Sequence, residues 1–232
     1  MKIAGRTALV TGANRGFGRH LAAELLARGA TVYAGARNPD TVDLPGVTPV
    51  RLDITDPASV AAAAELAGDV TLLLNNAGSG TGADLLDADP AKVRLEMETH
   101  YFGTLEMVRA FAPRIAANGG GTVLNVLSAL SWLALPVVGA YSAAKSAEWA
   151  LTNALRAQLA GRRVRVAGLY VGYMDTDMTA GLDVPKSDPA EIARIAVDGI
   201  ESDRYEILAD ETSRRVLSGL SGGVAALYPD LP

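Results

Sequence analysis

The residues of this 232-residue chain that most suggest chemistry are a tyrosine and a lysine in the run Tyr-Ser-Ala-Ala-Lys. Tyr141 and Lys145 lie one helical turn apart in the sequence, so a helix would place the phenol and the ammonium on one face. An isolated tyrosine has a pKa of about 10, and a cation within about 4 to 6 Å lowers that pKa by favouring the phenolate. Such a tyrosine can give or take a proton near neutral pH. The spacing alone is a weak signal, because on a helix it is more often a surface pair.

A serine is placed where it can bring a substrate oxygen to this pair. Ser128 follows the apolar run Thr122–Leu127, which predicts a buried strand. In a doubly wound sheet the carboxyl ends of the strands face the ligand crevice. The pattern therefore predicts three catalytic residues, Ser128, Tyr141 and Lys145, that act on one oxygen atom.

A glycine-rich turn near the amino terminus indicates a nucleotide site. The segment Thr11–Gly18 joins the apolar run Thr7–Thr11 to a helical pattern over Phe17–Arg28. Glycines let a pyrophosphate approach the free N–H groups of a helix N-terminus without a Cβ in the way. The spacing is G-x-x-x-G-x-G rather than the common G-x-G-x-x-G, and a tight strand-to-helix turn is the alternative. We predict that a dinucleotide binds here through Gly12, Arg15, Gly16, Phe17 and Gly18.

Two arginines predict which dinucleotide binds. NAD sites usually place an acidic residue at the end of the second strand, whereas the 2′-phosphate of NADP calls for arginine. Here the second strand, Thr31–Ala36, is followed by Arg37, and Arg15 lies in the glycine turn. Because a guanidinium binds a phosphate through two hydrogen bonds, NADPH is favoured over NADH. Two solvated surface arginines are the alternative interpretation.

The elements that position these residues alternate between strand and helix. Continuously apolar strands indicate burial on both faces, and the alternation indicates a parallel sheet with right-handed crossovers. We predict a single doubly wound α/β domain of the Rossmann type over residues 1–232. The expected strands are Thr7–Thr11, Thr31–Ala36, Val47–Leu52, Val70–Leu74, Thr122–Leu127, Val164–Tyr170 and Tyr205–Leu208. The expected helices are Phe17–Arg28, Pro57–Ala67, Pro90–Asn118, Tyr141–Leu159 and Pro189–Glu201, and Asp210–Pro232 is expected to hold a further helix, a break at Gly222-Gly223 and an apolar tail.

The composition argues against several classes of function. The net charge is −5, and the 21 basic residues form no stripe of the kind that neutralises a nucleic acid backbone. Cysteine is absent, which excludes disulfides, a thiolate nucleophile and a cysteine-based metal site. No apolar run approaches the length of a membrane span, and the first residues lack a secretory leader pattern. We expect a cytoplasmic protein that binds no nucleic acid, membrane or metal.

With these motifs in this order, the chain resembles the short-chain dehydrogenase/reductase family over essentially its whole length. The matching residues are the loop Thr11–Gly18, Asp53, the run Asn75-Asn76-Ala77-Gly78 and the three predicted catalytic residues. The resemblance implies that Asp53 binds the adenine amino group and that Ile54 contacts the ring. It implies that Asn75, Ala77 and Gly78 line the adenosine ribose and support the central sheet. A helix cap at Asp53 and a polar turn over residues 75–78 are the alternatives.

The resemblance also assigns residues to the nicotinamide half of the coenzyme. Lys145 would bind the nicotinamide ribose hydroxyls, so that Tyr141 and Lys145 belong to the coenzyme site as well as to the catalytic one. Thr176 would contact the carboxamide. The family usually follows its sixth strand with Pro-Gly, where this chain has Val171 and then Gly172, which we keep among the coenzyme-binding residues.

A second departure from the family pattern concerns proton transfer. Three residues before Gly103 the family usually has an asparagine whose main-chain carbonyl holds a water that links the active-site lysine to solvent. This chain has His100 there. A histidine can keep that carbonyl and can relay protons itself, and a buried, hydrogen-bonded structural histidine is the alternative.

These features together predict an NADPH-dependent oxidoreductase that reduces a small-molecule ketone or aldehyde with Tyr141 as proton donor. Alternatives are an NAD-dependent alcohol dehydrogenase and, more distantly, a non-catalytic dinucleotide sensor, which need not keep the three catalytic residues. The short segment Met174–Asp188 leaves little room for a large lid and suggests an open pocket. An apolar or aromatic substrate is expected from the residues around the crevice, Leu130, Trp132, Leu133, Leu135, Val138, Tyr173 and Met178.

The helices also predict self-association. The segments Pro90–Asn118 and Tyr141–Leu159 carry more apolar surface than one face of a sheet needs, and members of the family commonly pair these helices between subunits. We therefore expect a homodimer or a homotetramer.

Overall fold

A parallel sheet forms the centre of the structure, a computed structural model that describes residues 1–229. The sheet has seven strands in the order β3-β2-β1-β4-β5-β6-β7. Because the order reverses between β1 and β4, the carboxyl ends of these strands form the switch point at which such sheets bind ligands. The predicted doubly wound α/β fold is thereby confirmed, while its assignment to all of residues 1–232 remains a prediction. The strands are β1 (Thr7–Thr11), β2 (Thr31–Ala36), β3 (Thr48–Arg51), β4 (Leu72–Asn75), β5 (Gly121–Val126), β6 (Val164–Tyr170) and β7 (Glu206–Leu208).

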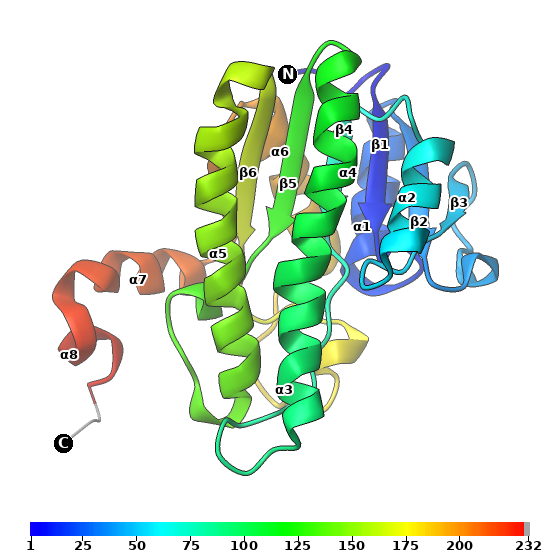
Figure 1. Ribbon diagram of the computed structural model, residues 1–232. Coiled ribbons are helices and arrows are strands. Elements are labelled where there is room, and N and C mark those ends of the chain that lie inside the picture. The colour runs from blue at the N-terminus through cyan, green and yellow to red at the C-terminus, as the bar shows by residue number, and fades with distance from the viewer. Residues whose placement is uncertain (230–232) are drawn as a thin grey trace.

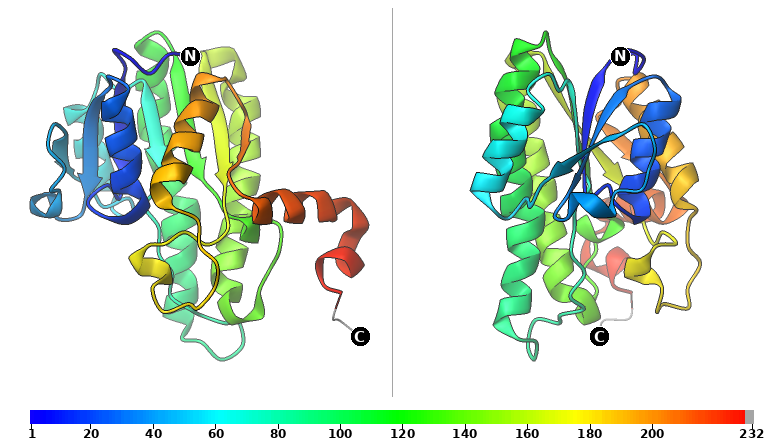
Figure 2. Two further views of the ribbon diagram at one scale, coloured as in Figure 1. Left: turned by 180° about the vertical axis from the view of Figure 1, so that it is seen from behind. Right: turned by 90° about the vertical axis from the view of Figure 1, so that its right-hand side faces the viewer.

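Helices cover both faces of this sheet (Figures 1 and 2). Neighbouring strand residues point to opposite faces, so Val10 of β1 packs toward one helical layer and Leu9 toward the other. Each layer encloses its own cluster of buried apolar side chains. One layer holds α1 (Gly16–Ala27) and α6 (Pro189–Glu201), and the other holds α2 (Pro57–Leu66), α4 (Thr104–Ala117) and α5 (Gly139–Leu159).

The predicted long helix Pro90–Asn118 is interrupted. It consists of α3 (Pro90–Met97), a π-helical turn over Glu98–Gly103, and α4. The turn lies against the sheet layer, since a Cβ at Gly103 would approach the Ile54 Cδ1 atom to 2.9 Å. Single π turns inside α-helices occur often at functional sites. The residue pattern did not reveal this interruption.

The carboxy-terminal part projects from the side of the domain (Figure 1). It contains α7 (Glu211–Gly219) and a short α8 (Gly223–Leu227). The predicted helix is confirmed as α7, and the expected apolar tail after Gly222 begins with a second helix at Gly223. The last predicted tail residues, 230–232, lie outside the described part of the chain. Within residues 1–229, no helix is long and apolar enough to cross a membrane.

Candidate active site

The structure brings two of the predicted catalytic residues together at the carboxyl edge of the sheet. Helix α5 begins at Gly139, so Tyr141 lies in its first turn and Lys145 in the next. The Lys145 Nζ atom lies 5.8 Å from the centre of the Tyr141 ring. Ser128 follows β5 and caps a short 3-10 turn, with its Oγ atom accepting a hydrogen bond of 3.1 Å from the Leu130 N–H.

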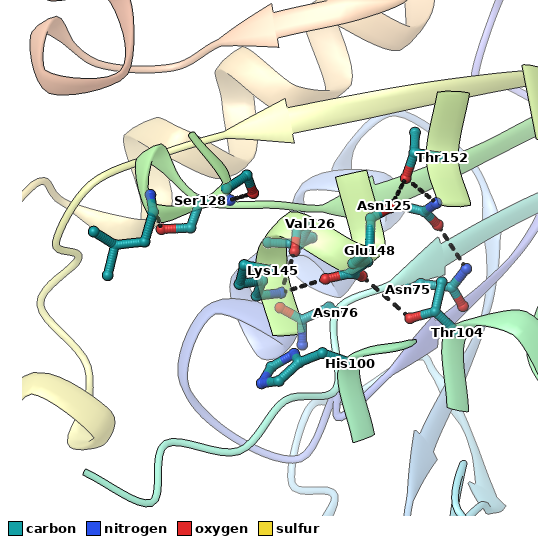
Figure 3. Close-up of polar contacts among 12 residues, drawn as sticks. Asn75, Asn76, His100, Thr104, Asn125, Val126, Ser128, Lys145, Glu148 and Thr152 are labelled. Carbon is teal, nitrogen blue, oxygen red and sulfur yellow. Dashed lines mark hydrogen bonds and ion pairs between the residues drawn. The ribbon is translucent and has the colours of Figure 1, made fainter. Parts of the chain in front are cut away.

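Lys145 is buried, and two acceptors bind its ammonium. Its ammonium donates to the Val126 carbonyl and to Glu148 Oε2, each at 2.7 Å (Figure 3). Burial opposes the charged form, but the Glu148 carboxylate outweighs it and raises the pKa of Lys145 above its ordinary value. Lys145 is therefore an ammonium ion at neutral pH.

The pKa of Tyr141 corrects one expectation. Burial of the half-buried Tyr141 raises its pKa, and the Lys145 ammonium lowers it as predicted. The carboxylates of Glu148 and Glu96 also raise the pKa, and the net shift is upward from the ordinary value of 10. The prediction of a phenol that titrates near neutral pH is thus wrong for this structure, because it counted the cation but neither the carboxylates nor the burial. Tyr141 remains able to donate a proton.

His100 lies in the π turn, directly beside Tyr141. The two rings meet edge to face with their centres 5.1 Å apart. His100 Nε2 lies 2.9 Å from the Ser79 carbonyl oxygen, 3.3 Å from Glu96 Oε2 and 3.3 Å from the Ser79 backbone nitrogen, so its tautomer decides whether it donates or accepts. His100 Nδ1 is buried and has no hydrogen-bond partner among the described residues. His100 is therefore held in the structure through Nε2, while Nδ1 faces no hydrogen-bond partner among the described residues. Its relay role remains a prediction.

Glu96 anchors the loop after β4 to this helix. Its Oε1 atom accepts from the Thr81 N–H at 2.6 Å, and its Oε2 atom accepts from Ser79 Oγ at 2.7 Å. Burial opposes ionisation, but these hydrogen bonds and the one from His100 lower the pKa of Glu96 to about 2. Glu96 is therefore a buried carboxylate that is ionised throughout the neutral range.

A chain of buried hydrogen bonds connects β4 to α5 behind the site (Figure 3). The Asn75 amide donates to Asn125 Oδ1 at 2.8 Å, and the Asn125 amide donates to Thr152 Oγ1 at 2.8 Å. The Thr152 hydroxyl donates to the Glu148 carbonyl at 2.7 Å. The family resemblance implied two roles for Asn75, lining the ribose and supporting the sheet. Its side chain points into this network, which fits the supporting role.

The glycine turn has the geometry of a close-approach site. Gly12 and Gly16 have φ angles of +64° and +52°, in the left-handed region that favours glycine. A Cβ on Gly18 would lie 2.2 Å from the Gly12 carbonyl oxygen, so only glycine fits there. The Thr11 hydroxyl accepts from the backbone N–H groups of Asn76 and Ala77 at 2.9 Å each, which fixes the turn to the end of β4.

The other residues of the predicted turn and of the 75–78 run serve partly as packing. Phe17 is buried in the cluster beneath α1, so its side chain belongs to the core. Ala77 lies against Gly12, whose Cβ would come within 3.0 Å of the Ala77 Cα. Gly78 lies against His100, because a Cβ there would approach His100 Cε1 to 2.8 Å.

The predicted adenine end forms a polar hollow beside β2 and β3. Asp53 Oδ1 accepts from the Thr55 N–H and hydroxyl at 3.0 and 2.7 Å, which fixes the carboxylate. Ile54 is buried and packs against the π turn. The residues that line the hollow are Arg37, Arg51, Asp53, Asp56, Ser59 and Ala62.

Arg15 is not among the residues that line this hollow. Its guanidinium pairs with Asp177 at 3.1 Å, and both side chains are largely exposed. The predicted convergence of Arg15 and Arg37 on one phosphate is therefore not seen. Arg51, at the end of β3, is the second arginine beside Arg37. Sequence reasoning assigned Arg15 because it lies in the glycine turn, whereas the pairing of β2 with β3 brings Arg51 to the hollow.

The segment after β6 closes over the other end of the groove. The Gly172 N–H donates to Asp210 Oδ2 at 2.6 Å, and Thr176 lies opposite Gly16. Met178 lies against Gly80, whose Cβ would come within 3.2 Å of the Met178 Cγ. Despite its shortness, this segment thus reaches both the glycine turn and the loop after β4. The open pocket remains a prediction.

One predicted crevice residue belongs to the core instead. Trp132 stacks on Tyr170 with ring centres 4.1 Å apart and is buried with Leu127 and Val216. Its packing follows from the path of β6, which the local sequence does not show. Tyr173 and Met178 are 37% and 55% exposed and remain available to a ligand.

Sequence reasoning missed three polar residues of the site and gave no role to a fourth, Asn76, which it had matched to the family. Glu96 precedes His100 by one helical turn, and Glu148 follows Lys145 on the buried stripe that continues to Leu151. This spacing was a usable signal for both glutamates. The other two are Asn76, whose amide donates to the Thr11 carbonyl at 2.9 Å, and Arg51.

Comparisons with known proteins agree on one family. The family model described as short chain dehydrogenase matches residues 6–186. The chain is 34% identical over 230 residues to 1-deoxy-11-beta-hydroxypentalenate dehydrogenase of Streptomyces avermitilis, covering 88% of this chain and 84% of that protein. A short chain dehydrogenase from Burkholderia cenocepacia, crystallised in complex with NADP, is 41% identical, covers 100% of both chains and superimposes with a TM-score of 0.95. A gluconate 5-dehydrogenase of the same species, in complex with NADP and tartrate, is 25% identical over 96% of this chain and 98% of that one, with a TM-score of 0.84.

Proposed function

Because the chain belongs to the short-chain dehydrogenase family of oxidoreductases, we propose that it reduces a small-molecule ketone or aldehyde with NADPH. One observation carries the proposal. A buried Lys145 ammonium lies beside the Tyr141 phenol at the carboxyl edge of the sheet, on the same edge as the glycine turn. A sensor that only binds a dinucleotide could use the lysine, but it has no need of a proton-donating phenol beside it.

The residues present fit NADPH. The glycine turn offers backbone N–H groups at the start of α1. A Cβ at Gly18 would collide with the Gly12 carbonyl oxygen, so the turn needs glycine at this position. Arg37 and Arg51 place two guanidinium groups in the hollow where a 2′-phosphate would bind. The Burkholderia relative that shares the fold over its full length was crystallised with NADP, which supports the same coenzyme here.

Each residue of the candidate site has one task in this reaction. When bound, the coenzyme supplies a hydride, with both its electrons, to the carbonyl carbon. Tyr141 donates its phenolic proton to the carbonyl oxygen, which becomes the alcohol. The Ser128 hydroxyl holds that oxygen in place, and the Lys145 ammonium stabilises the phenolate that Tyr141 leaves behind.

An apolar or aromatic carbonyl compound is the substrate class that we propose. Tyr173 and Met178 are partly exposed on the segment that closes the groove, and Leu130 is bound through its N–H to Ser128. Apolar walls with a few polar groups are typical of small-molecule sites. A permanently charged substrate would have to give up its hydration against these side chains.

Tyr141→Phe tests the proposal. The ring remains but the proton donor is lost, so we expect NADPH binding within about twofold of wild type and a loss of carbonyl reduction of at least about a hundredfold. A panel of ketones and aldehydes is assayed by loss of NADPH absorbance, and coenzyme binding by fluorescence. Tyr205→Phe, at an exposed tyrosine on the far side of β6, is the matched control and should keep full activity. Near wild-type turnover in Tyr141→Phe would show that the catalytic assignment is wrong.

A further inference from the structure

The carboxylate that contacts the active-site lysine has no role in the reaction as described so far. We propose that Glu148 is a positioning residue that binds the Lys145 ammonium, neutralises its charge beside Tyr141, and so keeps the Tyr141 phenol protonated as a proton donor. The inference rests on the proposed function, because it concerns the same tyrosine. It predicts that this site is adapted to give a proton, and thus to reduce carbonyls, over a wide range of pH.

The geometry fixes the carboxylate on the lysine. Glu148 Oε2 accepts from Lys145 Nζ at 2.7 Å, and Glu148 Oε1 accepts from Thr104 Oγ1 at 3.1 Å (Figure 3). Thr104 begins α4, directly after the π turn. Because one oxygen is held from each side, the carboxylate cannot swing away, and the ammonium is held between Glu148 and the Val126 carbonyl.

Stability alone is a poor explanation for this pair. Lys145 and Glu148 are only 5% and 2% exposed. The free energy lost when both charges leave water is about as large as the free energy gained from their attraction. Apolar residues on the same stripe, such as Leu151 and Leu155, fill the neighbouring positions of α5 without that cost. A charge pair kept within reach of the Tyr141 ring instead has an electrostatic consequence for the phenol.

The charged and titratable groups around Tyr141 come from three elements. Helix α5 contributes Lys145 and Glu148, α3 with the π turn contributes Glu96 and His100, and the end of β5 contributes the neutral Ser128 hydroxyl. Lys145 lowers the pKa of Tyr141, while Glu148 and Glu96 raise it, in addition to burial. If Glu148 is made neutral, only burial and Glu96 still oppose the effect of Lys145 on the phenol. The lysine and tyrosine together should then release their first proton at lower pH.

The pH profile of Glu148→Gln is the decisive measurement. Gln keeps the shape of the side chain and removes the charge, so the alkaline limb of kcat/KM for carbonyl reduction should move to lower pH by roughly one to three units. Glu106→Gln is the matched control, because Glu106 is a partly exposed carboxylate on α4 that pairs with Arg109. Its alkaline limb should coincide with that of the wild type. A uniformly lower rate in Glu148→Gln, with the limb unmoved, would show a merely structural role and overturn the proposal.

Two further measurements keep the test decisive. Glu148→Asp keeps the charge but withdraws it from Lys145, so the alkaline limb should shift in the same direction by a smaller amount. If Glu148→Gln does not fold, Glu148→Asp provides the test. An unmoved limb in that variant overturns the proposal. Tyr141 can also be titrated without a substrate, by comparing phenolate absorbance at each pH with and without Tyr141→Phe in each Glu148 background. The Tyr141 difference signal should appear at lower pH when Glu148 is Gln. If wild type reduces no carbonyl, the proposed function fails. The role of Glu148 is overturned separately, if the Tyr141 signal appears at the same pH in wild type and in Glu148→Gln.

Discussion

Replacing Glu96 by Gln should destabilise the protein in a way that depends on pH. The carboxylate of Glu96 is buried and accepts hydrogen bonds from the Thr81 N–H, the Ser79 hydroxyl and His100. An amide group keeps one oxygen but turns the other acceptor into a donor. The Thr81 N–H can keep the amide oxygen, but the Ser79 hydroxyl and His100 must turn or change tautomer to accept from the new amide N–H groups. A buried donor left without its acceptor costs about 1 to 3 kcal/mol.

The pKa of Glu96 gives a second measure of the same effect. Its pKa falls from 4.5 in the unfolded chain to about 2 in the folded protein. A depressed carboxyl pKa contributes stability that is fully present above pH 4.5 and is lost as the pH falls toward about 2. At about 1.4 kcal/mol per pKa unit, the ionised carboxylate stabilises the fold by about 3 kcal/mol at pH 7. We therefore expect Glu96→Gln to lower the free energy of unfolding by about that amount.

Urea unfolding of wild type and Glu96→Gln at pH 7 and pH 3.5 measures both the size and the sign. At pH 3.5 the unfolded chain already binds most of the proton, so the difference in unfolding free energy should shrink by about 1 kcal/mol. Glu98→Gln, at an exposed position of the π turn, is the control and should change stability by less than about 0.5 kcal/mol. A difference below about 1 kcal/mol at pH 7, or one that is the same at both pH values, would refute the reasoning.

Three further predictions follow from the coenzyme site and from the helices. Arg37→Asp and Arg51→Asp should each lower kcat/KM with NADPH about ten- to a hundredfold, because each variant loses a charge-assisted hydrogen bond. The value of kcat should fall much less, since the phosphate lies far from the reacting carbon. Equal use of NADH by wild type, or an unchanged ratio of the two coenzymes in both variants, would count against this prediction. Gly18→Ala should abolish coenzyme binding measured by fluorescence, since its Cβ would lie 2.2 Å from the Gly12 carbonyl oxygen, and unweakened binding would show that the turn can adapt. Light scattering of wild type at micromolar concentration should give a homodimer or homotetramer, and a monomer would contradict the pairing of helices expected between subunits.

Short-range patterns in the sequence were enough to predict the framework of the protein. The glycines of the 11–18 turn, the apolar strand runs and the helical spacing of Tyr141 and Lys145 all depend on residues a few positions apart. Such patterns determine where strands and helices form and which side chains share one face of a helix. Helix α6 and strands β1, β2 and β6 accordingly have the predicted bounds.

The tertiary structure decided which groups meet across elements, and these contacts set the electrostatics of the site. Arg15 pairs with Asp177 and Arg51 joins Arg37, because segments far apart in the chain lie side by side. The π turn brings His100 to Tyr141 for the same reason. The direction of the Tyr141 pKa shift was beyond the sequence, since burial and every charge within a few ångströms contribute to it. Sequence spacing shows only the charges on the same helix, whereas Coulomb interactions depend on distance in space and on the water that folding removes.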